Sequence, residues 1–254
     1  MGILDLFSLE GKTGFVTGGA RGIGRGIAAG LAEAGAKVAI VDIDSERAGA
    51  TAEELGKLGS ECFPIRADVT KKDQVGEMVD RVLSRWGRLD IAVNNAGTCR
   101  NVPAEEMSEA DWDIVVDLNL KAVFLCSQAA GKAMIARKSG SIINIASMSA
   151  QIVNYPQPQV SYNAAKAGVV HLTRSMAAEW ARYGVRVNAI SPGYVNTDLL
   201  QPAKELHPTW IDRTPQKRIG EPWEIAGMAV YLASDAARYC TGSDMLVDGG
   251  YTLW

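Results

Sequence analysis

The stretch Thr13–Gly24, which reads TGFVTGGARGIG, decides the fold. A short run rich in β-branched residues leads directly into glycines, and a helical pattern begins at Gly22. Glycines at such a turn let the backbone approach a pyrophosphate, whose charge is favoured by the N–H groups and dipole at the helix start. The stretch therefore predicts a strand–turn–helix unit that holds a dinucleotide.

The same alternation of apolar runs and helical stretches continues along the chain. Apolar spacing predicts helices over Gly22–Ala34 and Asp73–Trp86. Such alternation gives parallel βαβ units and a sheet covered on both faces. The runs expected to be strands are Thr13–Thr17, Lys37–Val41, Cys62–Arg66, Asp90–Val93, Ser141–Ile145, Val185–Ile190 and Met245–Val247. We therefore expect a single α/β domain over residues 1–254, with a parallel sheet of about seven strands.

One long stretch, at about residues 194–222, reads as irregular because it is rich in proline and polar residues. A loop of that length inside a compact domain is usually functional and often a lid. We expect this segment to be a substrate loop.

Composition excludes several classes of function. The chain has 254 residues, a net charge of −3 and no Lys/Arg-rich run, which argues against nucleic-acid or anionic-membrane partners. Its four cysteines form no CxxC pair, so neither a zinc site nor a disulfide framework is indicated. The first residues carry acids and no basic n-region, and no apolar run approaches the ~18 residues that span a bilayer. We expect a cytoplasmic protein.

Asp42 ends the second expected strand, in the run VAIVDID. An acid about 20 residues past the glycines is the usual partner of the adenosine ribose. Its carboxylate would repel a 2′-phosphate by roughly 3 kcal/mol per charge pair at ~5 Å and an effective dielectric of ~20. Asp44 is a rival for this role, and Arg21 opposes it because a basic residue in the turn could pair with a 2′-phosphate. We place Asp42 first and expect NAD as the cofactor.

Tyr162 and Lys166 stand four residues apart in SYNAAKAGVVHLTRSMAAEW, a helical pattern that puts both on one face. A tyrosine is a poor base at neutral pH, but a neighbouring ammonium favours the phenolate. Tyr162 could then exchange a proton with an alcohol or a carbonyl. A Tyr–Lys pair alone is ordinary surface chemistry, so its weight depends on the rest of the sequence.

The motifs together resemble the short-chain dehydrogenase/reductases along nearly the whole chain. These motifs are TGGARGIG, NNAG at Asn94–Gly97, Asn119, a serine after the fifth strand, YxxxK and Pro192-Gly193. The resemblance implies a doubly wound Rossmann-type domain and a homo-oligomer, usually a tetramer. It also implies that the protein is an oxidoreductase that acts on a small molecule.

The resemblance assigns roles to individual residues. Asn119 would hold a water in a proton relay, Ser147 would orient the substrate oxygen, Tyr162 would be the acid/base, and Lys166 would bind the nicotinamide ribose. The cofactor would be lined by Gly18, Arg21, Gly22, Ile23, Gly24, Asp42, Asp68, Val69, Asn95, Ala96, Gly97, Tyr162, Lys166, Pro192, Gly193, Val195 and Thr197.

The catalytic serine has two candidates in INIASMSAQ, namely Ser147 and Ser149. The commoner family spacing to the tyrosine selects Ser149. Ser147 is the first serine after the buried run, and we prefer it on the interpretation that the loop Ala150–Val160 is lengthened by two residues.

The stretch SMSAQIVNYPQPQVSYNAAK is similar to that of polyol dehydrogenases, as is the ending DGGYTLW. Uncharged amides suit a ligand with many hydroxyls, because each can donate and accept hydrogen bonds. The amides expected close to Tyr162 are Gln151, Asn154, Gln157 and Gln159; alternatively, they only cap turns. The residues expected to contact the substrate are Ser147, Ser149, Asn154, Gln159 and Tyr162.

Two other functions stay open. A 3-oxoacyl-carrier-protein reductase shares the catalytic set, and the basic residues that could receive an acidic carrier are Lys204, Arg213, Lys217 and Arg218. It normally prefers NADPH, which Asp42 opposes. The second is a catalytically silent NAD-binding regulator. The presence of the full set Asn119, Ser147, Tyr162 and Lys166 argues against it, because a regulator does not need an acid/base.

The chain ends on Leu253-Trp254, although terminal residues are normally polar. We expect Trp254 to be buried between subunits. Its carboxylate would then need an arginine or a divalent cation such as Mg²⁺, since an unpaired buried charge is costly. The two histidines, His171 and His207, are expected to be packed or solvated, with His207 a possible substrate contact.

Overall fold

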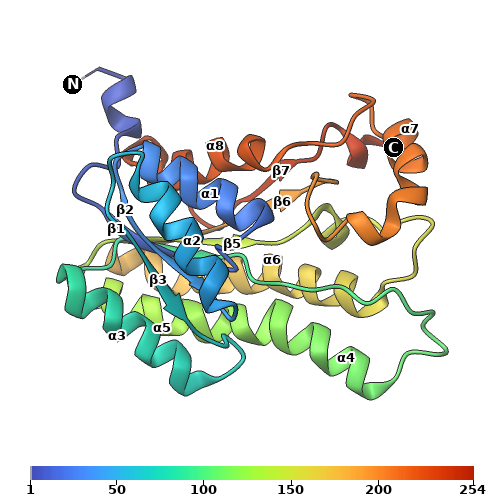
Figure 1. Cartoon of the computed structure of the whole chain (residues 1–254), viewed down its shortest axis with the longest axis horizontal. Helices are drawn as coiled ribbons and strands as arrows, with labels where there is room; N and C mark the ends of the chain where they lie inside the picture. Colours follow the sequence, from blue (N-terminus) through green and yellow to red (C-terminus); the bar gives the residue numbers. More distant parts are fainter. Residues whose placement is uncertain (1) are drawn as a thin grey trace.

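The computed structural model describes residues 2–254, apart from the side chain of Pro202. Seven strands form one sheet in the order β3-β2-β1-β4-β5-β6-β7 (Figure 1). All neighbouring strands are parallel. The strands are β1 (Thr13–Thr17), β2 (Lys37–Asp42), β3 (Cys62–Arg66), β4 (Ile91–Asn94), β5 (Gly140–Ile145), β6 (Val185–Pro192) and β7 (Asp244–Val247). The expected parallel α/β sheet is confirmed, with strand ends shifted by at most two residues.

The strand order reverses between β1 and β4. The chain moves outward from β1 through β2 to β3, then returns to the other side of β1 at β4. Val16 of β1 lies opposite Ile40 of β2 and Val93 of β4, so the carboxyl ends of these central strands lie together. In open α/β sheets, ligands bind at this switch point.

Helices cover both faces of the sheet (Figure 1). One apolar core joins the sheet to α1 (Gly22–Glu33), α2 (Ser45–Gly56) and α8 (Pro222–Ala233), with Ile27, Leu55 and Ile225 among its members. A second core joins the opposite face to α3 (Lys72–Trp86), α5 (Ala122–Arg137) and α6 (Val160–Trp180). The doubly wound arrangement is therefore confirmed.

A continuous helix runs from Glu109 to Arg137 through α4 (Glu109–Val116), a π-helical turn at Asp117–Lys121 and α5. The sequence shows no uninterrupted apolar run of that length, but this helix is long and apolar enough to cross a membrane, judged by length and composition only. Its α5 part packs Ala122, Cys126 and Met134 into the core. Within its most apolar 18-residue window, 44% is buried inside the chain.

The stretch 194–222 differs from the expected irregular loop. It contains a 3-10 helix at Gln201–Leu206 and α7 (His207–Arg213). Pro208 at the start of α7 is compatible with a helix, because proline at the first turn removes no intrahelical bond. Trp210 is buried and anchors α7 to the body of the domain. The proline content reflects the start of a helix rather than a loop.

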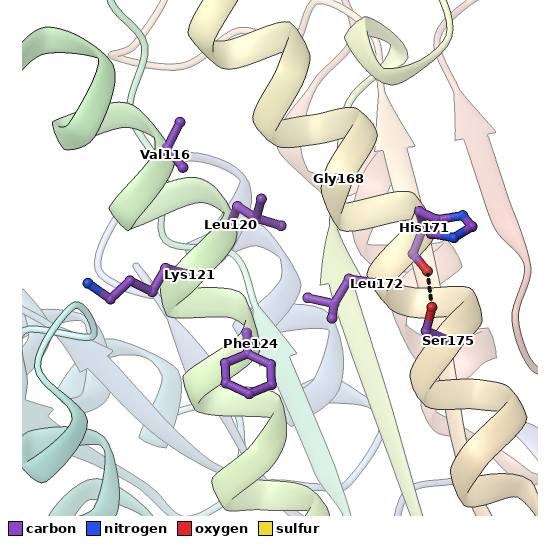
Figure 2. A pocket seen from close by; sticks show the side chains of 8 residues that line it. All are labelled: Val116, Leu120, Lys121, Phe124, Gly168, His171, Leu172 and Ser175. Carbon is purple, nitrogen blue, oxygen red and sulfur yellow. Dashed lines mark hydrogen bonds between the residues drawn. The ribbon is translucent and has the colours of Figure 1, made fainter. Parts of the chain in front are cut away.

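An apolar groove lies on the outer surface between the α4–α5 helix and α6 (Figure 2). The residues that line it are Val116, Leu120, Lys121, Phe124, Gly168, His171, Leu172 and Ser175. His171 lies at this groove with its ring exposed, in agreement with the expectation of a solvated histidine.

Candidate active site

The glycine-rich turn has no room for side chains. Gly18 has a φ of +60°, which glycine adopts without strain. A Cβ on Gly24 would lie 2.1 Å from the carbonyl oxygen of Gly18, so only glycine lets α1 start this close to the end of β1. The turn is therefore built for backbone approach to a phosphate, and the free N–H groups at the start of α1 supply its donors.

Asn95 ties the turn to the end of β4. Its Nδ2 donates to the carbonyl oxygens of Thr17 at 3.0 Å and Gly18 at 3.1 Å. In return, Thr17 Oγ1 accepts from the backbone N–H groups of Asn95 and Ala96. These bonds hold the ends of β1 and β4 together at the switch point, where Asn95, Ala96 and Gly97 were expected to line the cofactor.

Asp42 is half-buried at the end of β2 and is held by the turn it was expected to serve. Its Oδ2 accepts from the Ala20 backbone N–H at 3.3 Å, and its Oδ1 accepts from that of Asp44 at 3.1 Å. The rival Asp44 has another task, because it caps the N-terminus of α2 by accepting from the Arg47 backbone N–H. Asp42 is therefore the carboxylate positioned beside the glycine-rich turn.

The other expected cofactor residues lie at the same carboxyl edge of the sheet. Asp68 and Val69 follow β3, where Asp68 Oδ1 accepts from Thr70 Oγ1 at 2.7 Å. Thr197 lies next to Gly22, since a Cβ on that glycine would lie 3.2 Å from the threonine methyl group. Gly193 donates its backbone N–H to Val247 at 3.0 Å, which fixes the segment after Pro192.

Tyr162 and Lys166 lie one turn apart near the start of α6. Lys166 is buried, and its Nζ donates to the carbonyl oxygen of Ile145 at 2.7 Å. The same Nζ lies 5.5 Å from the centroid of the Tyr162 ring. The end of β5 therefore holds the ammonium beside the tyrosine, as the spacing predicted.

Burial shifts the pKa of both groups toward their neutral forms. It raises the pKa of Tyr162 to about 12, against the hydrogen bond with Ser147, which lowers it. It lowers the pKa of Lys166 to about 8, against the neighbouring Cys99, which raises it. Without a cofactor, Tyr162 is therefore a neutral phenol ready to donate a proton, and removing that proton requires additional positive charge nearby.

Ser147 and Ser149 differ in their effect on the tyrosine, because hydrogen bonding with Ser147 lowers the pKa of Tyr162. Ser147 forms the N-cap of the short helix at Met148–Ala150. Ser149 lies behind it and accepts a hydrogen bond from Ser147 Oγ at 3.0 Å. The effect of Ser147 on the pKa of Tyr162 favours Ser147, both serines lie in one polar chain, and the choice between them stays a prediction.

Asn119 lies in the π-helical turn between α4 and α5, a type of turn frequent at functional sites. Its Nδ2 donates to the carbonyl oxygens of Thr98 at 2.7 Å and Val115 at 2.9 Å. Its Oδ1 is buried without a hydrogen-bond partner and lies against Gly97. A buried oxygen without a protein partner is free to accept a hydrogen bond from a water molecule. This agrees with the water-holding role in a proton relay that the resemblance implies for Asn119.

The amides expected near the substrate divide into two groups. Asn154, Gln157 and Gln159 are buried, and Asn154 Oδ1 accepts from Ser149 Oγ at 2.6 Å and from Gln159 Nε2 at 2.9 Å. They extend the polar chain from Ser147 and hold one another. Gln151 differs from them, because it is exposed and donates to Asp244 of β7 at 2.9 Å instead of joining this chain.

The sequence interpretation missed three aromatic residues and one thiol next to this chain. Tyr194 stacks on Trp210 with ring centroids 4.1 Å apart, and Tyr251 meets Tyr194 edge-on at 5.3 Å. Cys99 Sγ lies 3.8 Å from Gln159 Oε1, and burial raises the pKa of this thiol to about 11. Tyr194 directly follows Pro192-Gly193, so its position in that motif was the available signal.

No magnesium site is supported. Among residues 2–254, no group of three or more His, Cys, Asp or Glu side chains is arranged to hold a metal ion. Trp254 is 78% exposed in the single chain, so its carboxylate needs no compensation there. The expected burial of Trp254 between subunits stays a prediction.

Comparison with known proteins agrees with this geometry. A family model described as enoyl-(acyl carrier protein) reductase matches residues 18–252. A short-chain type dehydrogenase/reductase from Mycobacterium marinum has a similar crystal structure, with a TM-score of 0.97, 44% identity and 99% coverage of both chains.

Relatives with different names are equally similar. Galactitol 2-dehydrogenase of Rhizobium johnstonii is 42% identical, covering 98% of each chain. NADP-dependent mannitol dehydrogenase of Hypocrea jecorina is 42% identical over 98% of this chain and 96% of that protein. A 3-oxoacyl-acyl-carrier-protein reductase of Staphylococcus epidermidis is 42% identical over 94% of this chain and 98% of that protein. The chain is an oxidoreductase and belongs to the short-chain dehydrogenase/reductase family.

Proposed function

We propose that this oxidoreductase transfers a hydride between NAD(H) and a secondary alcohol or its ketone, with a sugar alcohol and its ketose as the substrate pair. The observation that carries the proposal is the chain of uncharged hydrogen-bonding groups that continues from Ser147 through Ser149 to Asn154. Groups that both donate and accept suit a ligand with several hydroxyls. The polyol dehydrogenases among the relatives support the same substrate class.

The chain's own residues account for the proton. Tyr162 takes the hydroxyl proton of the alcohol or returns it to the ketone, and Ser147 binds the same oxygen. Positioned acid/base help of this kind contributes typically 10²–10⁴ in rate. Lys166, held by Ile145, supplies positive charge beside the phenol. A bound nicotinamide cofactor would accept or donate the hydride, and its oxidised ring would add the positive charge that favours the phenolate.

The proposed preference for NAD rests on Asp42, whose carboxylate is fixed beside the glycine-rich turn by the backbone of Ala20 and Asp44. Two cations, Arg21 and Arg47, weigh against a preference for NAD, because a basic side chain can pair with the 2′-phosphate of NADP. Both arginines approach Asp198 to 4.0 Å at the surface. These guanidiniums are exposed, and that of Arg47 lies closer to Asp44, at 3.3 Å. Because two backbone N–H groups orient the Asp42 carboxylate, we give Asp42 the larger effect.

A carrier-protein reductase is the alternative that the basic residues would favour. Two of the four are already paired within the chain, since Lys217 contacts Asp212 and Arg218 contacts Glu224 at 2.6 Å. The Arg218 pair lowers the pKa of Glu224 to about 2. This pairing reduces the positive charge left for an acidic carrier. The alternative of a silent NAD-binding regulator is disfavoured because a regulator needs no acid/base, whereas this chain carries Asn119, Ser147, Tyr162 and Lys166.

We also propose that the protein is a cytoplasmic homo-oligomer, a tetramer by family resemblance. All four cysteines are free thiols, which fits a reducing compartment. Leu253 and Trp254 are exposed at the C-terminus, and Phe124 is exposed beside the groove of Figure 2. Exposed apolar surface of this kind marks contact sites. Light scattering of the full chain tests the assembly, and a monomer at working concentration contradicts it.

A substrate panel tests the function. NAD or NADP is mixed with galactitol, sorbitol, mannitol or a simple secondary alcohol, and formation of the reduced cofactor is followed at about 340 nm. In a parallel assay, a 3-oxoacyl thioester is mixed with the reduced cofactor, and its consumption is followed at the same wavelength. We expect the highest kcat/KM with a sugar alcohol and NAD. A higher value for the thioester would favour the carrier-protein alternative, and no turnover of any substrate would favour the regulator.

A further inference from the structure

Tyr194 lies beyond the catalytic residues, at the far end of the polar chain that starts at Ser147. Its hydroxyl accepts from Asn154 Nδ2 at 3.2 Å and from Gln157 Nε2 at 2.8 Å. Asn154 in turn accepts from Ser149, the neighbour of Ser147. The Tyr194 hydroxyl is therefore separated from the reacting centre by a short row of hydrogen-bonding groups.

The direction of the bond from Gln157 follows from chemistry. Gln157 Oε1 accepts from Trp210 Nε1 at 3.2 Å, and an indole nitrogen can only donate. The Gln157 amide nitrogen must then face Tyr194 and donate to it. With a second donor from Asn154, the lone pairs of the Tyr194 oxygen are occupied, and its own proton remains to be donated. The group nearest to that proton among the described residues is the Tyr251 hydroxyl, whose interaction with Tyr194 raises the pKa of Tyr194, although the two oxygens do not meet in a hydrogen bond of standard geometry.

Tyr251 brings a second hydroxyl to the same place. Its side chain is 5% exposed, its ring meets Tyr194 edge-on, and its hydroxyl has no hydrogen-bond partner. This hydroxyl is near enough to contribute to the raised pKa of Tyr194, of which burial is the larger cause. A buried hydroxyl without a partner is destabilising, so its retention here calls for a ligand oxygen.

The rings of both tyrosines are fixed in place. Trp210 of α7 covers one face of Tyr194 at 4.1 Å, with the planes inclined by 9°. Asp248 holds the C-terminal turn that carries Tyr251, because its carboxylate accepts from the Gly250 and Thr252 backbone N–H groups at 2.9 Å. The two hydroxyls are therefore pre-positioned and lose little freedom on binding a ligand.

We propose that the hydroxyls of Tyr194 and Tyr251 form a second oxygen-binding subsite, which holds a hydroxyl of the polyol beyond the carbon that reacts at Tyr162. The proposal rests on the proposed polyol function and deepens it. It makes the two tyrosines specificity-determining residues, since Tyr194 is half-buried and the ring of Tyr251 meets it edge-on at 5.3 Å. A substrate that lacks the distal hydroxyl would gain nothing from the subsite.

The test compares Tyr251→Phe and Tyr194→Phe with the wild type on a hexitol and on a short vicinal diol such as butane-2,3-diol. Tyr239→Phe is the matched control, because Tyr239 is fully exposed. We expect KM for the hexitol to rise about tenfold in both variants. In Tyr251→Phe, which removes no hydrogen bond of the polar chain, kcat should stay within about twofold and KM for the diol should not change.

A stability readout separates binding from packing. Tyr251→Phe removes a hydroxyl that has no partner, so its Tm should equal or exceed that of the wild type. Tyr194→Phe leaves two amide donors unpaired, so its Tm should fall. A Tm loss in Tyr251→Phe would show that its hydroxyl is already satisfied within the protein and would overturn the proposal.

The kinetic outcomes are distinct. If the wild type oxidises hexitols but Tyr251→Phe shows the same KM, or an equal rise for hexitol and diol, the subsite is wrong and the polyol function stands. If the wild type oxidises simple alcohols and no hexitol, the polyol function fails, and the subsite proposal fails with it.

Discussion

The cofactor half and the substrate half of this site are built differently. Around the glycine-rich turn, Gly18, Asp42 and Asn95 each lie within two residues of the end of a central strand, and backbone groups hold them. On the substrate side, Ser149, Asn154, Gln157, Tyr194 and Trp210 hold one another by side chains from three separate segments.

The two halves therefore differ in how well they can be predicted from sequence patterns. The cofactor half is formed by backbone groups at glycines and strand ends that are close together in the sequence, so a short motif identifies it. A side-chain network depends on which distant segments meet, which only the tertiary fold determines. The following changes should therefore separate the two halves, by affecting either cofactor use or substrate use.

Tyr162→Phe should have the largest effect and should leave the cofactor half untouched. The change removes only the hydroxyl that exchanges the proton, so kcat should fall by roughly 10²–10⁴. NADH binding, followed by the change in its fluorescence, should stay within about twofold of the wild type. Turnover above about 1% of the wild type would contradict the acid/base role.

Ser147→Ala and Ser149→Ala should differ by about tenfold or more in kcat/KM, with Ser147→Ala the slower enzyme. Ser147 contacts Tyr162, whereas Ser149 supports Ser147 from behind. Steady-state kinetics on the best sugar alcohol measures the difference. The reverse order would assign the substrate oxygen to Ser149.

Asp42→Ser should affect only the cofactor half. Loss of the carboxylate removes a repulsion of roughly 3 kcal/mol, so the ratio of kcat/KM for NADP to that for NAD should rise up to roughly a hundredfold. KM for the polyol should not change. If the unmodified protein already prefers NADP, Arg21 and Arg47 outweigh Asp42, and the proposed NAD preference is wrong.

Lys166 lies between the two halves and should show a pH effect. Burial lowers the pKa of its ammonium to about 8, so the free enzyme holds this charge below that pH and loses it above. Since kcat/KM reports the free enzyme, its value for ketone reduction should decline as pH rises through about 8. A profile that stays flat to about pH 10 would show that the ammonium keeps its proton or is not needed.

The fold and much of the site could be predicted from the sequence. Strands β1 to β7 follow apolar runs, and Tyr162 with Lys166 follows from helical spacing, because both patterns are local. The sequence does not reveal helix α7, because Pro208 in its first turn is also typical of a loop. Trp210 can be identified as the buried anchor of this helix only from the tertiary structure. The orientations of the Gln151, Tyr194 and Tyr251 side chains depend on contacts with segments that are distant in the sequence. The spacing of residues therefore does not predict them.

The central claim is that a hydride passes between a sugar alcohol carbon and the cofactor at this site. A hexitol deuterated at every carbon, incubated with NAD and the wild-type protein, tests it directly when the reduced cofactor is analysed by mass spectrometry. We expect reduced NAD that carries one deuterium from the wild type, and no more than trace amounts of reduced NAD from the Tyr162→Phe variant, because that variant lacks the group that exchanges the proton. Reduced cofactor without deuterium, or no reduction by any hexitol, would contradict the account.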